Sequence, residues 1–173
     1  MNDPMNDTHT TDGEHYRIPA HPRMIAALGR AMWNFLSLEE TAVAILAEVG
    51  THNLTRARAL MAGGKEMALK RALTELRRRG APPTVLKALE KGIEAFALAC
   101  SEYRNALAHA GLFTAGYDDD GTYLPGIALK GDSGAERMIR DASELHAEAH
   151  AIENCSAYLG EARTAITAFL NPN

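Results

Sequence analysis

Apolar residues recur at helical spacing over most of this chain, which predicts a helical protein. Between about Pro22 and Val49 they fall three or four residues apart, as on one face of an amphipathic helix. Ser37 followed by Glu40 resembles a capping box, so this stretch is predicted to form either one helix or two. Gly50 and the polar residues after it end the segment.

A second helical segment is predicted from Leu54 or Thr55 to Arg79. Gly63-Gly64 lies inside it, and each glycine weakens a helix by about 1 kcal/mol relative to alanine. The alternatives are therefore a continuous helix and one with a kink or short break at this pair. Gly80 is expected to end the segment.

A third helix is predicted from about Pro83 to Ala110, because prolines favour a helix start and Gly111 suits a C-terminal cap. Aromatic and branched residues on both sides of an Asp-Gly turn then predict a β-hairpin over about residues 112–130. Pro125 should confine its second strand to a sheet edge. Ser133 and Glu136 form another capping-box pattern, which predicts that the last helix runs from there to about Leu170.

The predicted fold class is all-α: a four- to five-helix, mostly antiparallel bundle with a small β-hairpin inserted before the last helix. Residues 1–20 are rich in Asn, Asp, Thr and His, which predicts a disordered N-terminal tail. Residues 21–173 are then expected to form a single helical domain.

Composition favours a globular protein of the cytoplasm. The chain has 173 residues, 46% of them apolar, which suffices for a sizeable core. It lacks both the long uncharged stretch of a membrane helix and the basic and apolar start of a signal peptide. Cys100 and Cys155 show no metal-ligand spacing, so free, buried thiols in a reducing compartment are expected. No metal or other cofactor is predicted.

The net charge of −4 hides a basic segment. Between Arg56 and Lys91 there are ten Lys or Arg residues against three Glu, a local balance of about +7. The densest part is the run Arg77, Arg78 and Arg79. A basic face suits a polyanion such as RNA, and a solvated helix surface is the alternative interpretation.

The hexapeptide Arg104-Asn105-Ala106-Leu107-Ala108-His109 is the stretch that points most directly to chemistry. A histidine exchanges protons near neutral pH, and an arginine can hold a phosphate through two hydrogen bonds. On a straight helix Asn105 and His109 are neighbours, whereas Arg104 lies about 140° around the axis from His109. Two copies packed across a two-fold axis would bring both side chains together, which predicts a homodimer with a shared site.

The pattern Arg104-Asn105-x-x-x-His109, late in a long helix, resembles the signature of the HEPN superfamily. The resemblance implies a four-helix bundle that dimerises, with the two motifs in a cleft at the interface. It also implies a metal-independent endoribonuclease in a toxin–antitoxin, phage-defence or RNA-processing system, with a cognate antitoxin or regulator as a partner. Carried over by position, Arg104 and His109 would be the catalytic pair and Asn105 would orient them.

The expected reaction is attack of an RNA 2′-OH on the adjacent phosphate, giving a 2′,3′-cyclic phosphate and a 5′-OH. His109 would move the protons, and Arg104 would stabilise charge on the phosphoryl oxygens. Because the reaction needs a 2′-OH, DNA should not be a substrate.

Several other residues are weaker candidates for a site. His146 and His150, with Glu153 one turn later, form either a metal-binding face or a solvated polar face. The carboxylates of the pair Glu39-Glu40 and of Glu102 are candidates to position Arg104, and surface charge is the alternative interpretation of them.

Three functions therefore stand as hypotheses. The first is a dimeric HEPN-type ribonuclease. The second is a non-catalytic nucleotide- or partner-binding regulatory module of the same fold. The third is a structural helical dimer in which the motif only caps its helix.

Overall fold

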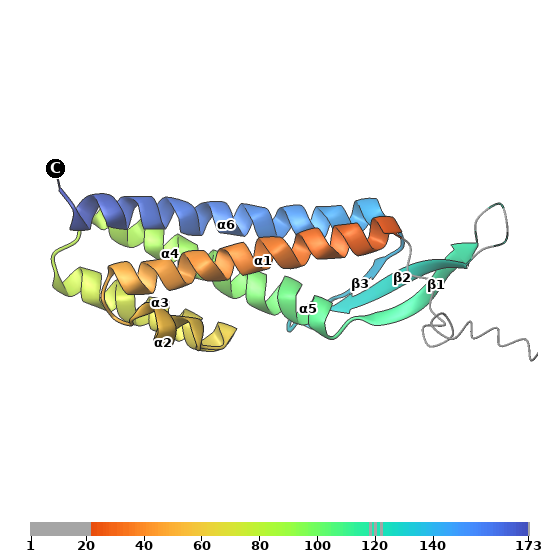
Figure 1. Cartoon of the computed structure of the whole chain (residues 1–173), viewed down its shortest axis with the longest axis horizontal. Coiled ribbons are helices and arrows are strands. Elements are labelled where there is room, and N and C mark those ends of the chain that lie inside the picture. The colour runs from red at the N-terminus through yellow and green to blue at the C-terminus, as the bar shows by residue number, and fades with distance from the viewer. Residues whose placement is uncertain (1–21, 118, 120, 122, 173) are drawn as a thin grey trace, which may run out of the picture.

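The computed structural model describes every residue except 1–21, 118, 120, 122 and 173. The predicted N-terminal tail lies outside the described residues. The structure is mostly helical, with a small sheet at one end of a long helical bundle (Figure 1). Its helices and strands are α1 Pro22–Glu48, α2 Leu54–Arg58, α3 Ala62–Arg78, α4 Pro83–Leu98, the π-helix η1 Ala99–Arg104, α5 Asn105–Ala108, β1 Gly111–Tyr117, β2 Tyr123–Lys130, β3 Glu136–Ile139 and α6 Ala142–Leu170.

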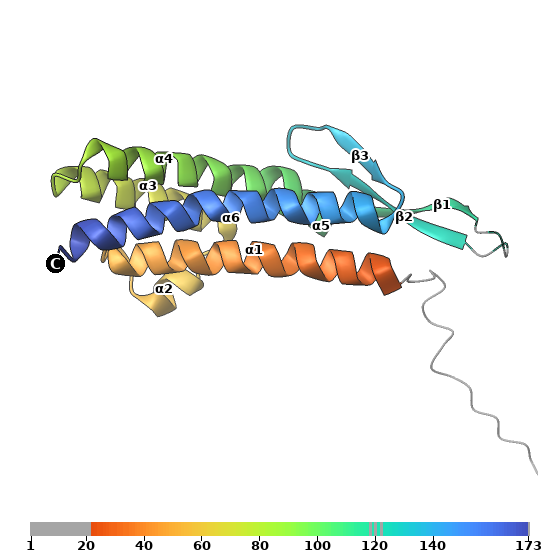
Figure 2. The same cartoon turned by 90° about the horizontal axis from the view of Figure 1, so that it is seen from above.

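The bundle is of mixed direction. Asn34 Nδ2 donates to the Ala149 carbonyl at 2.9 Å, and Glu48 pairs with Arg163 at 2.7 Å, so α1 and α6 run in the same direction. Figures 1 and 2 show the two long helices side by side along most of their length. The helix α4 runs against both, as the colours of Figure 1 show. The bundle was predicted to be mostly antiparallel, but of these three helices only α4 is antiparallel to the others.

The reason for this arrangement is the short helix α2. It reverses the chain after α1, so α3 begins again near the middle of the bundle and runs in the direction of α1 (Figure 1). Lys65, early in α3, pairs with Glu39, and Arg79, just after α3, donates to the Val49 carbonyl at 2.9 Å. The two helices therefore lie parallel, with their C-terminal ends together.

The core is divided into a large cluster and a small one. Within the large cluster, α4 approaches α6 closely at Gly92, where an added Cβ would lie 3.0 Å from Leu159 Cδ1. The small cluster joins the start of α1 to α5, the sheet and the start of α6. Its buried members are Met24, Ala27, Ala106, Ile127, Leu129, Ile139 and Leu145.

The predicted limits of the first two helical segments are largely confirmed. The helix α1 is continuous, and Ser37 Oγ donates to the Trp33 carbonyl one turn earlier, so the two-helix alternative is excluded. Gly50 and Gly80 end their helices at φ of 76° and 75°, a region that glycine reaches without a Cβ clash. The second segment does break, but at residues 59–61, ahead of Gly63-Gly64.

The end of the motif helix differs from the prediction. The helix stops at Ala108, with His109 as its C-terminal cap residue at φ −111°. Gly111 is not the C-cap: it opens β1 and does not have a positive φ. The chain therefore passes from helix to strand within two residues.

The predicted hairpin is confirmed as β1 and β2, but the sheet has a third antiparallel strand, in the order β1-β2-β3. The strand β2 is therefore central, and the prediction of an edge strand at Pro125 was wrong. Pro125 is tolerated because β3 pairs only with residues 127–130 of β2. At Pro125 the strand therefore has a paired neighbour in β1 but none in β3.

The predicted start of the last helix was also wrong. Glu136 opens β3, and the side chain of Ser133 binds Glu102 instead of capping a helix. The helix α6 begins at Ala142, and Asp141 caps it by accepting from the Ser143 backbone N–H at 2.7 Å. In the part of the chain that the structure describes, no helix is long and apolar enough to cross a membrane.

Candidate functional site around the Arg-Asn-x-x-x-His motif

A π-helical turn leads into the motif and ends at its first residue, Arg104. The helix α4 continues into η1, and the backbone N–H of Asn105 bonds to the Cys100 carbonyl, five residues earlier. Such turns are rare in proteins, and many of those that do occur lie at functional sites. Arg104 is the last residue of the turn, so the change of helical pitch falls where the motif begins. No signal in the sequence predicted this turn.

Arg104 and Asn105 are joined to each other and to the sheet. The half-buried Arg104 donates from Nη1 to Asn105 Oδ1 at 3.1 Å. Asn105 Nδ2 in turn donates to Asp132 Oδ2, also at 3.1 Å. The Asn105 amide thus lies between a guanidinium and a carboxylate, which fixes the orientation of that amide.

His109 stands apart from this chain of hydrogen bonds. Its side chain is exposed, and among the described residues it has no hydrogen-bond partner. Its backbone N–H donates to the Asn105 carbonyl at 3.0 Å, but the side chains of the two residues do not bond. One chain therefore leaves the His109 imidazole accessible and does not link it to Arg104 or to the Asn105 amide.

Glu102 anchors the turn between β2 and β3 to the π-helix. Its carboxylate accepts from the Ser133 backbone N–H at 3.0 Å and from Ser133 Oγ at 2.7 Å. The Ser133 hydroxyl, and then its N–H, hold the pKa of Glu102 below its usual value. Gly131 packs against the same carboxylate, since a Cβ there would lie 2.3 Å from Glu102 Oε2. Glu102 makes no bond to Arg104 among the described side chains.

A second set of contacts fastens β3 to the same place. Arg137 of β3 donates from Nη2 to the Glu102 carbonyl at 2.6 Å and makes a two-point pair with Glu148 of α6. Its guanidinium also lies 5.6 Å from the centre of the Tyr103 ring, within the range of a cation–π contact. These contacts connect the sheet, the π-helix and α6 beside the motif.

The thiol of Cys100 lies on the inner side of the π-helix, among charged groups of α1 and α3. Burial raises the pKa of Cys100 to about 12, and the nearby carboxylates of Glu39 and Glu66 add to the effect. Arg104 and Lys65 act in the opposite direction. Both cysteines are free thiols, as predicted, but Cys155 is buried whereas Cys100 is only partly buried.

The pair Glu39-Glu40 does not bond to Arg104. The buried Lys65 pairs with Glu39 at 3.3 Å, and Arg58 pairs with Glu40 through two hydrogen bonds of 3.2 and 2.9 Å. Glu39 thus serves to neutralise a buried lysine, which would otherwise be costly.

The basic run does not lie beside the motif. Arg77, Arg78 and Arg79 are at the C-terminal end of α3, at the end of the bundle opposite the sheet (Figure 1). Each pairs with a carboxylate: Arg77 with Glu90 at 3.1 Å, and the other two with Glu75 at 2.8 and 2.7 Å. The motif and the basic run are therefore separate features.

The histidines of α6 form an exposed face. His150 Nδ1 lies 3.3 Å from Glu153 Oε2, and His146 is also exposed. Among the described residues, no group of three or more His, Cys, Asp or Glu side chains is arranged to hold a metal ion.

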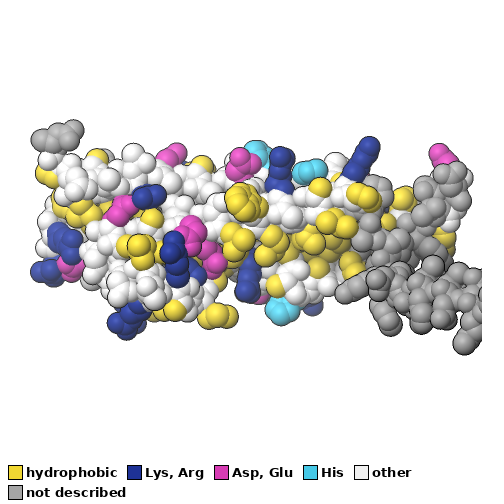
Figure 3. All heavy atoms as spheres, viewed as in Figure 1, with side chains coloured by type: hydrophobic (Ala, Val, Ile, Leu, Met, Phe, Trp, Pro, Cys, Tyr) yellow, Lys and Arg dark blue, Asp and Glu magenta, His cyan; other side chains and the backbone are white. Residues whose placement is uncertain are grey.

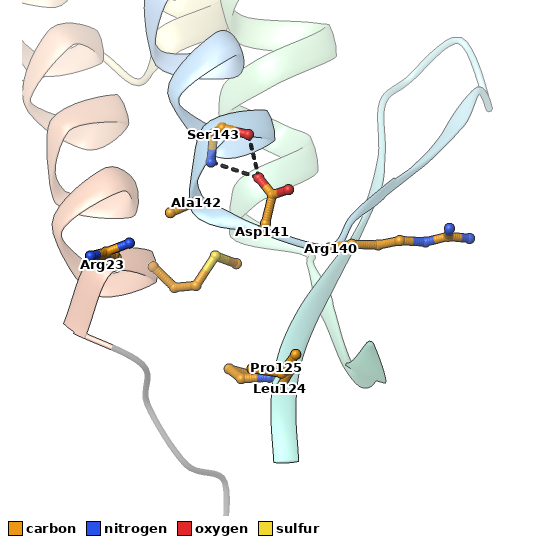
Figure 4. Close-up of a pocket in the computed structure, with 8 residues that line it drawn as sticks. Arg23, Leu124, Pro125, Arg140, Asp141, Ala142 and Ser143 are labelled. Carbon is orange, nitrogen blue, oxygen red and sulfur yellow. Dashed lines mark hydrogen bonds between the residues drawn. The ribbon is translucent and has the colours of Figure 1, made fainter. Parts of the chain in front are cut away.

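A pocket of about 330 Å³ lies where the start of α1, the strand β2 and the start of α6 meet. Figure 4 shows Arg23 on one side of it, while Arg140 extends away on the other. Asp141, between them, accepts from the Ser143 hydroxyl, which lowers the pKa of its carboxyl. The pocket contains no motif residue, and its carboxylate is engaged as a helix cap.

No protein-family model matches this sequence, and neither a curated protein nor a solved structure matches it.

Proposed function

We propose that this protein is a metal-independent endoribonuclease of HEPN type that acts as a homodimer, with Arg104 and His109 as its catalytic pair. The observation that carries the proposal is the pattern Arg104-Asn105-x-x-x-His109 at the end of a helix, with the imidazole of His109 exposed and unpaired among the described residues. A general base must be able to reach its substrate, and this side chain meets that condition.

The chemistry follows from the two side chains. His109 takes the proton of the RNA 2′-OH as that oxygen forms a bond to phosphorus, and the bond from phosphorus to the 5′-oxygen breaks. The resulting His109 imidazolium then gives that proton to the departing 5′-oxygen. Arg104 balances the charge that develops on the phosphoryl oxygens. The products are a 2′,3′-cyclic phosphate and a 5′-OH.

An apolar stripe on α1 supports the homodimer. Ile25, Met32 and Leu36 are 55%, 39% and 52% exposed, and at about 100° per residue they lie within about 40° of one another around the axis. Trp33, 70% exposed, lies further around the axis, towards α6. Figure 3 shows hydrophobic side chains gathered over the half of α1 nearest the sheet. Exposed apolar patches of this kind mark interaction surfaces.

The stripe lies on the flank of α1 that faces the motif helix. Leu28, next to the stripe, packs on the same small core as Leu107 of α5. Asn34, on the opposite flank of α1, bonds to α6. Two copies packed through this stripe would therefore bring their motif helices near the two-fold axis.

The remaining parts of the proposal rest on the resemblance and on the thiols. A toxin or phage-defence role, with a cognate antitoxin or regulator, is what the HEPN resemblance implies. The free thiols of Cys100 and Cys155 support a reducing compartment such as the cytoplasm.

The test is digestion of a labelled single-stranded RNA in EDTA by the wild type, His109→Ala and His146→Ala. His146 is a matched control, because it is also an exposed histidine but lies on α6. We expect cleavage by the wild type and His146→Ala, with cyclic phosphate ends, and a loss of about a hundredfold or more in His109→Ala. Equal cleavage by all three proteins, or none by the wild type, would remove the proposal.

A second candidate is a non-catalytic nucleotide- or partner-binding regulatory module of the same fold. The observation that favours it is that the side chains of Asn105 and Glu102 hold the β2–β3 turn, instead of pointing at His109. Such a module would bind RNA or a nucleotide beside Arg104 without yielding cyclic phosphate ends.

A further inference from the structure

A second concave site lies at the end of the bundle opposite the sheet. It is a pocket of about 530 Å³ between the end of α1, the segment that leads into α2, and α3. One wall contains His52 and Arg56, which lie before and within α2. The other wall is formed by α3 and the residue that caps it: Arg71, Thr74, Glu75 and Arg79. Its size is in the range of pockets that bind small molecules.

The pocket carries an excess of positive charge. Its three arginines and one glutamate give the lining a net charge of +2 with His52 neutral. The carboxylate of Glu75 is already engaged, because Arg78 and Arg79 donate to it and lower its pKa to about 2. Arg79 also donates to the Val49 carbonyl at 2.9 Å, so its guanidinium is held in place.

The other two arginines are available to a ligand. The guanidinium groups of Arg56 and Arg71 are exposed, and neither has an ion pair or a hydrogen bond among the described residues. This contrasts with Arg77, Arg78 and Arg79 on the same end of the bundle, each of which is paired with a carboxylate. Unpaired arginines that converge on one hollow favour a bound anion.

His52, which also lines the pocket, has one unsatisfied polar atom. Its Nδ1 atom is buried and has no hydrogen-bond partner in the part of the chain that the structure describes. A buried polar atom without a partner is uncommon and costs stability. Because this atom has almost no accessible surface, a ligand oxygen would reach it only after the imidazole turned towards the pocket.

We infer that this pocket binds the terminal phosphate of a phosphate monoester, carried either by a free 5′-nucleotide or by the 5′ end of an RNA. A monoester has a charge of about −1.5 to −2 at pH 7 and three acceptor oxygens, which matches the charge of the lining. Arg56 and Arg71 would each bind the phosphate through guanidinium N–H groups, and the volume leaves room for the attached nucleoside. The site is separate from the motif, so it stands or falls independently of the ribonuclease proposal.

The experiment is isothermal titration calorimetry at 0.15 M NaCl with inorganic phosphate, 5′-AMP and adenosine. We expect binding of 5′-AMP, weaker binding of phosphate and none of adenosine. Arg56→Ala and Arg71→Ala should each weaken 5′-AMP binding about tenfold or more, since each removes a charge-assisted contact. Arg77→Ala, an equal charge loss from α3 outside the pocket, should leave the affinity within about twofold.

Short 2′-O-methyl oligonucleotides, which resist cleavage through the 2′-OH, identify the source of the phosphate. Tighter binding of an oligonucleotide with a 5′-phosphate than of its 5′-OH counterpart would assign the site to RNA ends. Equal affinity for the two oligonucleotides, with 5′-AMP still bound, would assign it to free nucleotides. The inference is overturned if 5′-AMP and adenosine bind alike, if neither 5′-AMP nor phosphate binds at millimolar concentration, or if Arg77→Ala weakens binding as much as Arg71→Ala. Melting temperatures of all variants confirm that each is folded.

Discussion

Asn105 Nδ2 donates to Asp132 Oδ2 at 3.1 Å, which joins the motif helix to the turn between β2 and β3. The same amide accepts from Arg104 Nη1. The inserted sheet is therefore fastened to the element that carries the candidate chemistry, and it holds the neighbour of Arg104 in one orientation. This gives the sheet a positioning role in the proposed site.

The anchorage of the turn depends on the absence of a side chain at Gly131. Gly131→Ala should displace the Glu102 carboxylate and disrupt its bonds to Ser133, because the new Cβ would meet Glu102 Oε2 at 2.3 Å. We expect the free energy of unfolding to fall by about 1–3 kcal/mol.

A double-mutant cycle in urea tests this explanation. In a Glu102→Ala background the clash with the carboxylate is absent, so Gly131→Ala should cost clearly less than in the wild type. Equal costs in both backgrounds would show that the two residues are not coupled.

Gly92 lies where α4 packs tightly against α6. A Cβ at this position would lie 3.0 Å from Leu159 Cδ1 and 3.3 Å from its Cα. Gly92→Ala should therefore destabilise the protein by about 1–3 kcal/mol, although alanine favours a helix. Gly160→Ala in α6 meets nothing within 4 Å and should stabilise by up to about 1 kcal/mol. Thermal melts followed by circular dichroism compare the two, and the same sign of change in both would contradict this packing.

The helices were largely predictable, because amphipathic spacing and glycine stops are local signals. Pro22 to Val49 and the stops at Gly50 and Gly80 emerged almost unchanged. The third strand was missed for a physical reason. Ser133 and Glu136 fit a capping box locally, but Ser133 is bound by Glu102, 31 residues earlier, and Glu136 pairs with Lys130.

The arrangement of the site was less predictable than the motif itself. The hexapeptide predicts Arg104, Asn105 and His109 as site residues. The π-turn at Cys100 has no such local signal, and the partner of Asn105, Asp132, is 27 residues away in the chain. The basic run was visible in the sequence, whereas its pairing with Glu75 and Glu90 was not. The unpaired Arg56 and Arg71, on the other hand, are recognisable only once α2 and α3 are in place.

The two cysteines should react slowly in the folded protein. Burial raises the pKa of Cys100 to about 12 and also raises that of the buried Cys155, so at pH 8 both remain protonated and are poor nucleophiles. Iodoacetamide at pH 8 should label neither thiol appreciably in the native protein. In guanidinium chloride both should be labelled, as mass spectrometry would show. Rapid native labelling of Cys100 would contradict its burial on the inner side of the π-helix.

The proposal of a shared site is tested most directly by mixing two inactive variants. Arg104→Ala and His109→Ala are assayed on labelled RNA in EDTA, each alone and after refolding together in equal amounts. If the catalytic pair comes from two copies, each variant alone is inactive. The mixture then recovers about a quarter of the wild-type activity, since half of the dimers are mixed and each of these has one intact site. A mixture no more active than its components, beside an active wild type, would contradict the shared site.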